Sequence, residues 1–446
     1  CETLYTSPDA AERRKAEEAL VQLSTTPDYI PRCRQVLAES AKPYAQLVAS
    51  NALKRLLVSH WNHLTPAEQG EQRSYALTYL ATHGPTCAPY VAASLVSLVA
   101  CVTKLGWADM ADHQQVLVDV NQFLQATPAH LVLGLQLLHA IVTEMNAVSN
   151  TRSLSQHRKV AGAFRDECLF AIFQVSLDTL QKHGAPGTAT AGTEPARVSV
   201  VCLQLSLACL GYDFIGTTLD EASEELGTIQ VPSSWRATME APATMQLYFD
   251  VYSTCSNPPA KLALEVLVAL GSIRRSLFSS DDERQGFLNR ILNGTLAILQ
   301  TQRGLTDHEN YHELCRLLAR LKANFQLAEL VQCASYPEWI SLVATLTVDS
   351  FTHWEWASNS VYYLLSLWSR LVASMPYLKG ETPSHLESYV PQVITAFIQS
   401  RMELVTQLLQ TEADIDDPLA DDEQLHEQLD ALPSLCRFQL QAVSTY

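Results

Sequence analysis

The sequence is poor in positive charge. Its 446 residues include 30 Lys and Arg against 47 Asp and Glu, which leaves a formal net charge of -17. Nucleic-acid backbones attract clusters of basic side chains, so this balance argues against a nucleic-acid partner. An acidic surface suits either a basic protein partner or simple solvation.

Two kinds of apolar pattern are also missing. The alternating runs that indicate β-strands are nearly absent, and no apolar run reaches the roughly 18 residues of a membrane helix. Ala88–Val102 and Leu131–Val142 come nearest, but they are too short or contain polar residues. We therefore predict buried helices at these positions and no membrane insertion.

Signature motifs of nucleotide-binding and hydrolase cores do not occur. The 11 cysteines include no CxxC pair, and most lie in apolar helical runs. That distribution predicts buried free thiols in a reducing compartment, the nucleus or cytosol. We expect no catalytic residues, no cofactor and no metal.

One motif could contradict this expectation. His308 to His312 reads HExxH, a pattern that binds zinc on one helix face in metalloproteases, and Glu329 could be a third ligand. However, the motif follows Asp307, which is placed to cap a helix, so His308 would lie in the first turn. The cap favours an ordinary helix start, and zinc remains the alternative.

Helical periodicity runs along the chain. It predicts single helices over 157–182 and 327–353, the second with a break at Pro337, and Thr65 is placed to cap a helix that begins at Pro66. Ala11–Trp61 shows this periodicity first, as amphipathic segments separated by a Pro-marked break. Each segment leaves an apolar face that needs a neighbouring helix. Two such helices recur about every 40–55 residues, the spacing of HEAT and armadillo arrays. The sequence predicts an all-α fold, a HEAT-repeat superhelical solenoid of antiparallel helix pairs with an extended protein-binding surface.

Charged residues occur both in segments between the predicted helices and on the helices themselves. The loop at 211–236 is too long for a hairpin turn, and a second acidic segment covers 412–430. Arg274 and Arg275 end an apolar helix, where they could clamp an acidic partner or form an internal ion pair. Arg316, Arg320 and Lys322 form a basic stripe that is either a solvated face or a binding patch. The acidic loop centres on Asp220, Glu221, Glu224 and Glu225.

The residues also carry a family resemblance. Ala11–Leu80, with Ala49–Lys54 followed by Trp61 and Leu64, is similar to the importin-β N-terminal domain. More specific stretches resemble the exportins of the importin-β superfamily over essentially all 446 residues. These stretches are Thr103–Trp107, His157–Asp166, Asp213–Arg236, Asn310–Lys322 and Trp354–Trp368.

The resemblance implies a monomeric nuclear transport receptor that shuttles between nucleus and cytoplasm. Such receptors bind Ran-GTP and protein cargo together and contact Phe-Gly nucleoporins in the pore. Residues 1–105 would be Ran-binding repeats, and 106–446 further HEAT repeats of the N-terminal part of a longer solenoid. The alternatives are a HEAT scaffold that does not depend on Ran, or an importin-type receptor for some cargoes.

Site residues are predicted from the polar sides of the inner helices. We expect the acidic loop to reach a basic patch on Ran or cargo, and Arg274, Arg275, Arg316 and Arg320 to line the concave face. Ordinary solvent exposure is the alternative for each residue. The predicted Ran-binding residues are Gln46, Ser50, Lys54, Ser94, Ser97 and Lys104.

Overall fold

The computed structural model describes residues 7–148, 153–183, 194–214, 228–378 and 383–414. Nearly all of these residues are helical, and their only β feature is an isolated bridge between Ile229 and Ile273. The chain divides into two compact units. The first comprises Cys1–Ala185 and Ala189–Glu221, and the second Pro186–Thr188 and Ala222–Tyr446.

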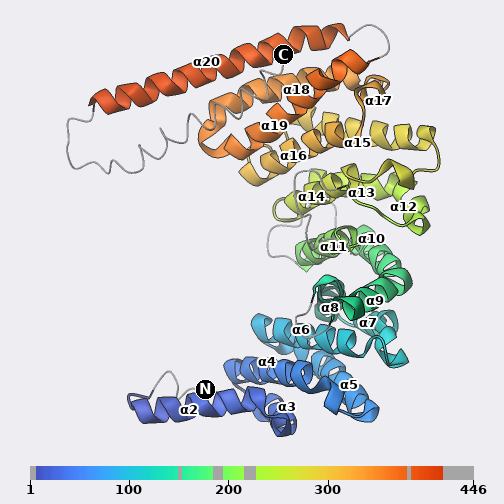
Figure 1. The fold of residues 1–446 in the computed structure, drawn as a ribbon, viewed down its shortest axis with the longest axis vertical. Helices are drawn as coiled ribbons and strands as arrows, with labels where there is room; N and C mark the ends of the chain where they lie inside the picture. The colour runs from blue at the N-terminus through green and yellow to red at the C-terminus, as the bar shows by residue number, and fades with distance from the viewer. Residues whose placement is uncertain (1–6, 149–152, 184–193, 215–227, 379–382, 415–446) are drawn as a thin grey trace. The chain divides into compact units, whose positions relative to one another are not determined.

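The first unit is a two-layer helical array, drawn from blue to green in Figure 1. Successive helices pair, α3 with α4, α5 with α6, α7 with α8 and α10 with α11, and α4, α6, α8 and α11 pack in turn as one layer. Its helices are α2 (Ala10–Thr25), α3 (Ile30–Glu39), α4 (Pro43–His60), α5 (Pro66–His83), α6 (Pro89–Gly106), α7 (Val116–Leu124), α8 (Pro128–Asn146), α9 (Leu154–Phe164), α10 (Phe170–His183) and α11 (Glu194–Leu210).

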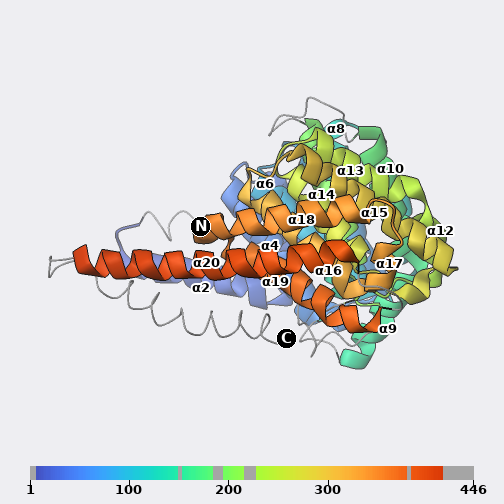
Figure 2. The same ribbon diagram turned by 90° about the horizontal axis from the view of Figure 1, so that it is seen from above.

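The second unit repeats the arrangement. Helices α14, α16 and α19 pack in order as one layer, and α13, α15, α18 and α20 pack in order as the other. In both ribbon views α20 extends past α18, on which it packs (Figures 1 and 2). The helices are α12 (Arg236–Glu240), α13 (Pro242–Thr254), α14 (Pro259–Gly271), α15 (Asp281–Thr301), α16 (His308–Asn324), α17 (Leu327–Val331), α18 (Tyr336–Ser350), α19 (Trp354–Ser374) and α20 (Ser384–Asp414).

This architecture confirms the predicted fold class, an all-α HEAT-like helical solenoid. Helices of the array bury apolar stripes against their pairs and against the next repeat, whereas α2 has no buried residue. The predicted free thiols are also present. All nine cysteines among the described residues are unpaired, and eight of them are buried.

Helix α6 corrects one sequence expectation. It has 18 residues and is apolar enough to cross a membrane by length and composition, whereas the apolar run Ala88–Val102 was expected to be too short. In the structure, 72% of that span is buried, and α6 packs against α4, α5 and α8. Burial on these sides is what a core helix of a helical array requires.

Helix ends follow the predicted caps. The Thr65 hydroxyl accepts from the Glu68 amide, and the Glu68 carboxylate accepts from the Thr65 amide, which together form a capping box at α5. At α16, the Asp307 carboxylate accepts from the Glu309 and Asn310 amides. His308 is therefore the first residue of its helix, as predicted.

Two long predicted helices are subdivided. The segment predicted as one helix over 157–182 contains a π-helical stretch at Arg165–Leu169, between α9 and α10. The segment predicted over 327–353 breaks between α17 and α18, just before Pro337, where a break was anticipated. A glycosylation-like pattern at Asn293–Thr295 lies inside α15, and Thr295 is fully buried there.

Candidate functional site

The predicted Ran-binding stripe lies along the layer of α4, α6 and α8. Ser50 was expected on the free side of α4, but it is fully buried, and Ser94 on α6 is only 8% exposed. The Ser94 hydroxyl donates to Ser50 or to the Asn51 amide oxygen, both at 3.0 Å. The expectation of a free surface is therefore wrong for Ser50 and Ser94, which join two repeats.

Lys104 is another residue for which the expected free surface is wrong. Its side chain is 5% exposed, and its ammonium donates to the carbonyl oxygens of Glu144 and Ala147, each at 2.6 Å. These carbonyls lie at the C-terminal end of α8, where helix groups lack intrahelical partners and a cation is favourable. Lys104 thus caps α8 from α6, and the predicted free cation is absent from this position.

The remaining predicted residues are accessible. The Lys54 ammonium on α4 donates to the Ser97 hydroxyl on α6 at 2.8 Å, and both side chains are half-buried. The Gln46 side-chain amide, also half-buried, donates to the Ser40 carbonyl at 2.9 Å. Lys54 and Ser97 therefore present a cation and a hydroxyl together at the α4–α6 seam.

Two exposed residues of α4, Asn51 and Arg55, were not among the predicted site residues. They are four residues apart, so they lie on one face of the helix. Ser50 and Lys54 are also four residues apart, and they form a neighbouring stripe on the same helix. Periodicity alone did not show which of the two stripes is the exposed one. The accessible polar side of this seam therefore comprises Gln46, Asn51, Lys54, Arg55 and Ser97.

Arg274 and Arg275 are exposed in the second unit, and both have internal partners. The Arg274 guanidinium donates to the Thr228 hydroxyl at 3.1 Å, and Arg275 forms an ion pair with Asp281 at 2.6 Å. These contacts agree with the internal ion-pair alternative for Arg275. They hold Arg275 beside the first turn of α15 and Arg274 beside Thr228.

Arg316 and Arg320 lie on α16, which packs between α14 and α19. The Arg316 guanidinium pairs with Glu313 at 3.2 Å. Burial raises the pKa of the Glu313 carboxyl, and Arg316 opposes that shift. Burial lowers the pKa of Arg320, with Arg316 and Arg370 of α19 adding to the effect. The structure thus groups Arg320 with Arg316 and Arg370 but leaves Arg274 and Arg275 elsewhere.

The HExxH histidines have other contacts. The His308 ring stacks on Trp356 at 3.9 Å between centroids, and His312 lies 3.2 Å from the Ser360 hydroxyl. Glu329, the suggested third ligand, pairs with Arg284 at 2.7 Å. Within the described ranges, no three candidate ligands come together in a way that could hold a metal ion. The zinc alternative therefore has no site in this part of the chain.

The acidic loop residues lie outside the described residues. Asp220, Glu221, Glu224 and Glu225 fall between 215 and 227. The predicted acidic segment at 412–430 is described only to residue 414. Their proposed role at a partner therefore stays a prediction.

Comparison with known proteins shows which families the chain resembles. The importin-beta N-terminal domain matches residues 16–82, from α2 to α5. Exportin-7-B of Xenopus laevis is 40% identical over 441 residues, and Ran-binding protein 17 of Homo sapiens is 38% identical over 441 residues. Each alignment covers 98% of this chain and 40% of the relative. Over nearly its whole length the chain is similar to proteins named exportin-7 and Ran-binding protein 17.

Other relatives agree with this assignment. Ran-binding protein 16 of Drosophila melanogaster is 40% identical over 441 residues, covering 97% of the chain and 39% of that relative. The chain thus spans about 40% of the length of the curated relatives it matches. The resemblance expected from the sequence motifs is confirmed. The domain boundary at residue 105 stays a prediction.

Proposed function

We propose that this chain acts as part of a nuclear export receptor that binds Ran-GTP and protein cargo together. The observation that carries the proposal is the similarity to proteins named exportin-7 and Ran-binding protein 17 over 98% of the chain. The helical array supports it, because stacked helix pairs offer a long surface for large protein ligands. No covalent reaction is part of the proposal.

The Ran contact is proposed on the accessible polar side of the α4–α6 seam. Three observations support this surface. Its α4 residues lie within the importin-beta N-terminal match, it carries the cations Lys54 and Arg55, and it presents the Ser97 hydroxyl beside Lys54. Ser50, Ser94 and Lys104 hold the underlying helices in place, so they position the surface without facing the partner.

Ran loaded with GTP or GDP tests the proposal directly. In a pull-down with residues 1–446, we expect the GTP form to be retained preferentially. Arg55→Gln should weaken retention about fivefold or more, because a charged contact at a protein interface is lost. Arg158→Gln, which removes an equally exposed arginine on α9, is the matched control and should bind Ran as the unmodified chain does.

Different failures have different meanings. Equal retention of both nucleotide forms would favour the alternative of a HEAT scaffold that acts without Ran. If Arg55→Gln still prefers the GTP form, the receptor proposal stands, but the Ran contact must lie outside this seam.

Cargo binding, contact with Phe-Gly nucleoporins and shuttling between nucleus and cytoplasm complete the proposed cycle. In such a receptor each ligand offsets part of the free energy needed to shape the array for the other. A coupling of about 1–3 kcal/mol changes affinity roughly 5–150-fold. Import of some cargoes by the same array is the variant of this role that the sequence leaves open.

A further inference from the structure

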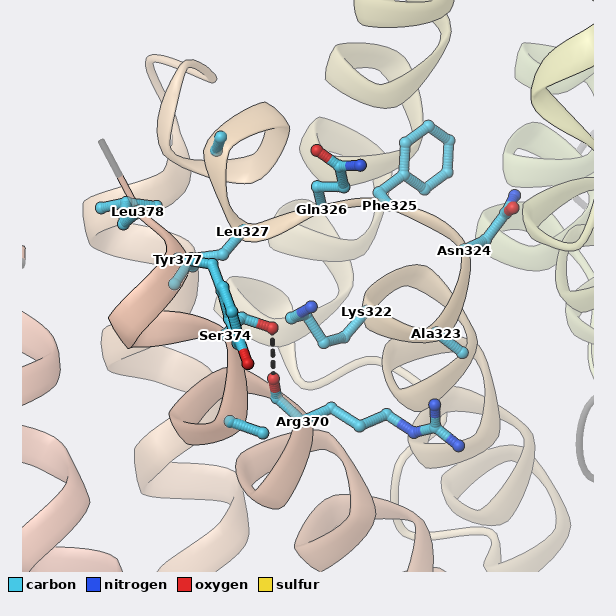
Figure 3. Close-up of a pocket in the computed structure, with 12 residues that line it drawn as sticks. Lys322, Ala323, Asn324, Phe325, Gln326, Leu327, Arg370, Ser374, Tyr377 and Leu378 are labelled. Atoms are coloured by element: carbon cyan, nitrogen blue, oxygen red, sulfur yellow. Dashed lines mark hydrogen bonds between the residues drawn. The ribbon is translucent and has the colours of Figure 1, made fainter. Parts of the chain in front are cut away.

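A pocket of about 450 Å³ opens in the second unit, between the end of α16, the start of α17 and the end of α19. Figure 3 shows Lys322 reaching from α16 toward Ser374 on α19, with Arg370 one turn earlier on α19. A smaller hollow of about 40 Å³ follows the same two helices and shares Ala323 and Arg370 with the pocket. The two hollows form one groove, which we call the α16–α19 groove.

Lys322 is the unusual residue of the groove. It is 7% exposed, and its ammonium makes no hydrogen bond or ion pair with the described residues. Burial lowers the pKa of Lys322, and Arg370 adds to that effect. Glu329 is the carboxylate that opposes the shift, but it is already paired with Arg284. A largely buried lysine whose ammonium has no protein partner is costly, and an anionic group in the pocket would offset that cost.

The whole groove is cationic. Among the described residues, its lining includes Arg316, Arg320, Lys322 and Arg370 but no Asp or Glu. This is notable in a chain that has 47 acidic residues and 30 basic ones. Among the described residues, the Arg370 guanidinium makes one long hydrogen bond, 3.5 Å to the Ser366 hydroxyl. Charge complementarity therefore points to an anionic occupant.

The distance between the cations indicates what size of anionic ligand the groove can hold. Arg316 and Lys322 are six residues apart on α16, which corresponds to about 9 Å along the helix axis. A single phosphate or carboxylate is too small to reach both ends of the groove. Alternate residues of an extended peptide are roughly 7 Å apart, and two flexible acidic side chains on such a peptide can span the somewhat longer separation of the cations.

The pocket also has apolar residues at its edge. Leu378 and Tyr377 lie beside the pocket, and Tyr377 is 85% exposed. An aliphatic side chain between two acidic residues could pack on this rim. A long polyanion such as nucleic acid would instead be repelled by the net charge of -17.

We propose that the α16–α19 groove binds an extended acidic segment of a protein partner, with a carboxylate of that segment on Lys322 and Arg370. The site goes beyond the proposed Ran contact, which lies in the first unit. It needs neither Ran nor a nucleotide. A failed Ran experiment and a failed groove experiment are therefore separate results.

Fluorescence anisotropy with residues 1–446 tests the groove. The probe is a short labelled peptide that alternates glutamate and leucine, compared with one that has glutamine in place of glutamate. We expect the glutamate peptide alone to bind, and Lys322→Met and Arg370→Gln each to weaken its binding about tenfold or more. Arg303→Gln, which removes an exposed arginine of the same unit, should have no such effect.

Folding is checked in the same series. Lys322→Met replaces an unpaired buried cation by an apolar chain, so its thermal midpoint should equal or exceed that of the unmodified protein. If this variant did not fold, Arg370→Gln at a half-buried position would decide the matter. Undiminished binding by a folded Lys322→Met, or an equal loss in Arg303→Gln, would overturn the site. Tighter binding of a single-stranded oligonucleotide than of the peptide would overturn the assigned occupant.

Discussion

At the residue scale, this array uses polar side chains as joints between repeats. Ser50 and Ser94 share a hydrogen bond across α4 and α6, and Lys104 of α6 caps the end of α8. His113 belongs to the same group. It is fully buried, and its Nδ1 lies 3.1 Å from the Val102 carbonyl near the end of α6.

His113 should make stability depend on pH. Burial lowers its pKa from 6.5 to about 4, with the positive charge of Arg73 adding to the effect. Between these values the unfolded chain takes up a proton that the folded chain excludes. The free energy of unfolding should therefore fall as the pH drops from about 6.5 to 4, and His113 contributes about 3 kcal/mol over the whole interval.

Urea unfolding of the unmodified chain and of His113→Gln at several pH values measures this contribution. The difference in slope between the two proteins is the readout, because His139 and His157 also have lowered pKa values through burial. The absolute stability of the variant is not the readout, since the substitution also alters packing. Parallel pH profiles would show that His113 does not titrate in this way.

At the element scale, the spacing of adjacent helices depends on small residues. A Cβ added at Gly294 of α15 would lie 2.2 Å from the nearest Phe249 ring atom, and Phe249 belongs to α13. Such a contact cannot be relieved by a flexible side-chain end, because a buried aromatic ring fills the space. The two helices therefore approach more closely here than a side chain allows.

Gly294→Ala should lower the free energy of unfolding by about 1–3 kcal/mol through overpacking. Gly286→Ala in the same helix is the matched control, since its Cβ would meet only the end of Arg290 at 3.5 Å. That control should gain about 0.5–1 kcal/mol, because alanine favours a helix more than glycine does. Chemical denaturation of both variants decides the point, and two shifts of the same sign would contradict it.

At the scale of the whole molecule, each compact unit has its own layers of helices. In a repeat array, stability is close to a sum of repeat and nearest-neighbour contributions. Damage to one repeat should therefore spread mainly through its own unit. Hydrogen exchange can measure this because it reports local opening separately along the chain.

Gly106→Ala is a substitution that should destabilise one repeat locally. The added Cβ would lie 2.3 Å from the His113 ring, at the end of α6. We expect faster amide exchange in α4, α6 and α8 and little change in α14, α16 and α19. Equal acceleration in both sets of helices would mean that the two units open as one cooperative body.

Particular residues show how far sequence reasoning reaches. Thr65 and Asp307 were identified as caps from local spacing, because a cap needs only the backbone amides two or three residues away. Ser50 and Lys104 were misjudged as free surface. Both lie on polar stripes that look solvated along one helix, but in the structure they face another helix 40 or more residues away in the chain.

The sequence by itself determined the helical array, its pairing rhythm, its free thiols and its resemblance to the exportins. Periodicity, local caps and motif order are properties of neighbouring residues, so no tertiary information is needed to see them. The tertiary structure decided which polar residues join repeats, which remain accessible at the α4–α6 seam, and that Lys322 is buried beside Arg370. These facts depend on contacts between distant helices, and helical periodicity does not specify which neighbour covers which stripe.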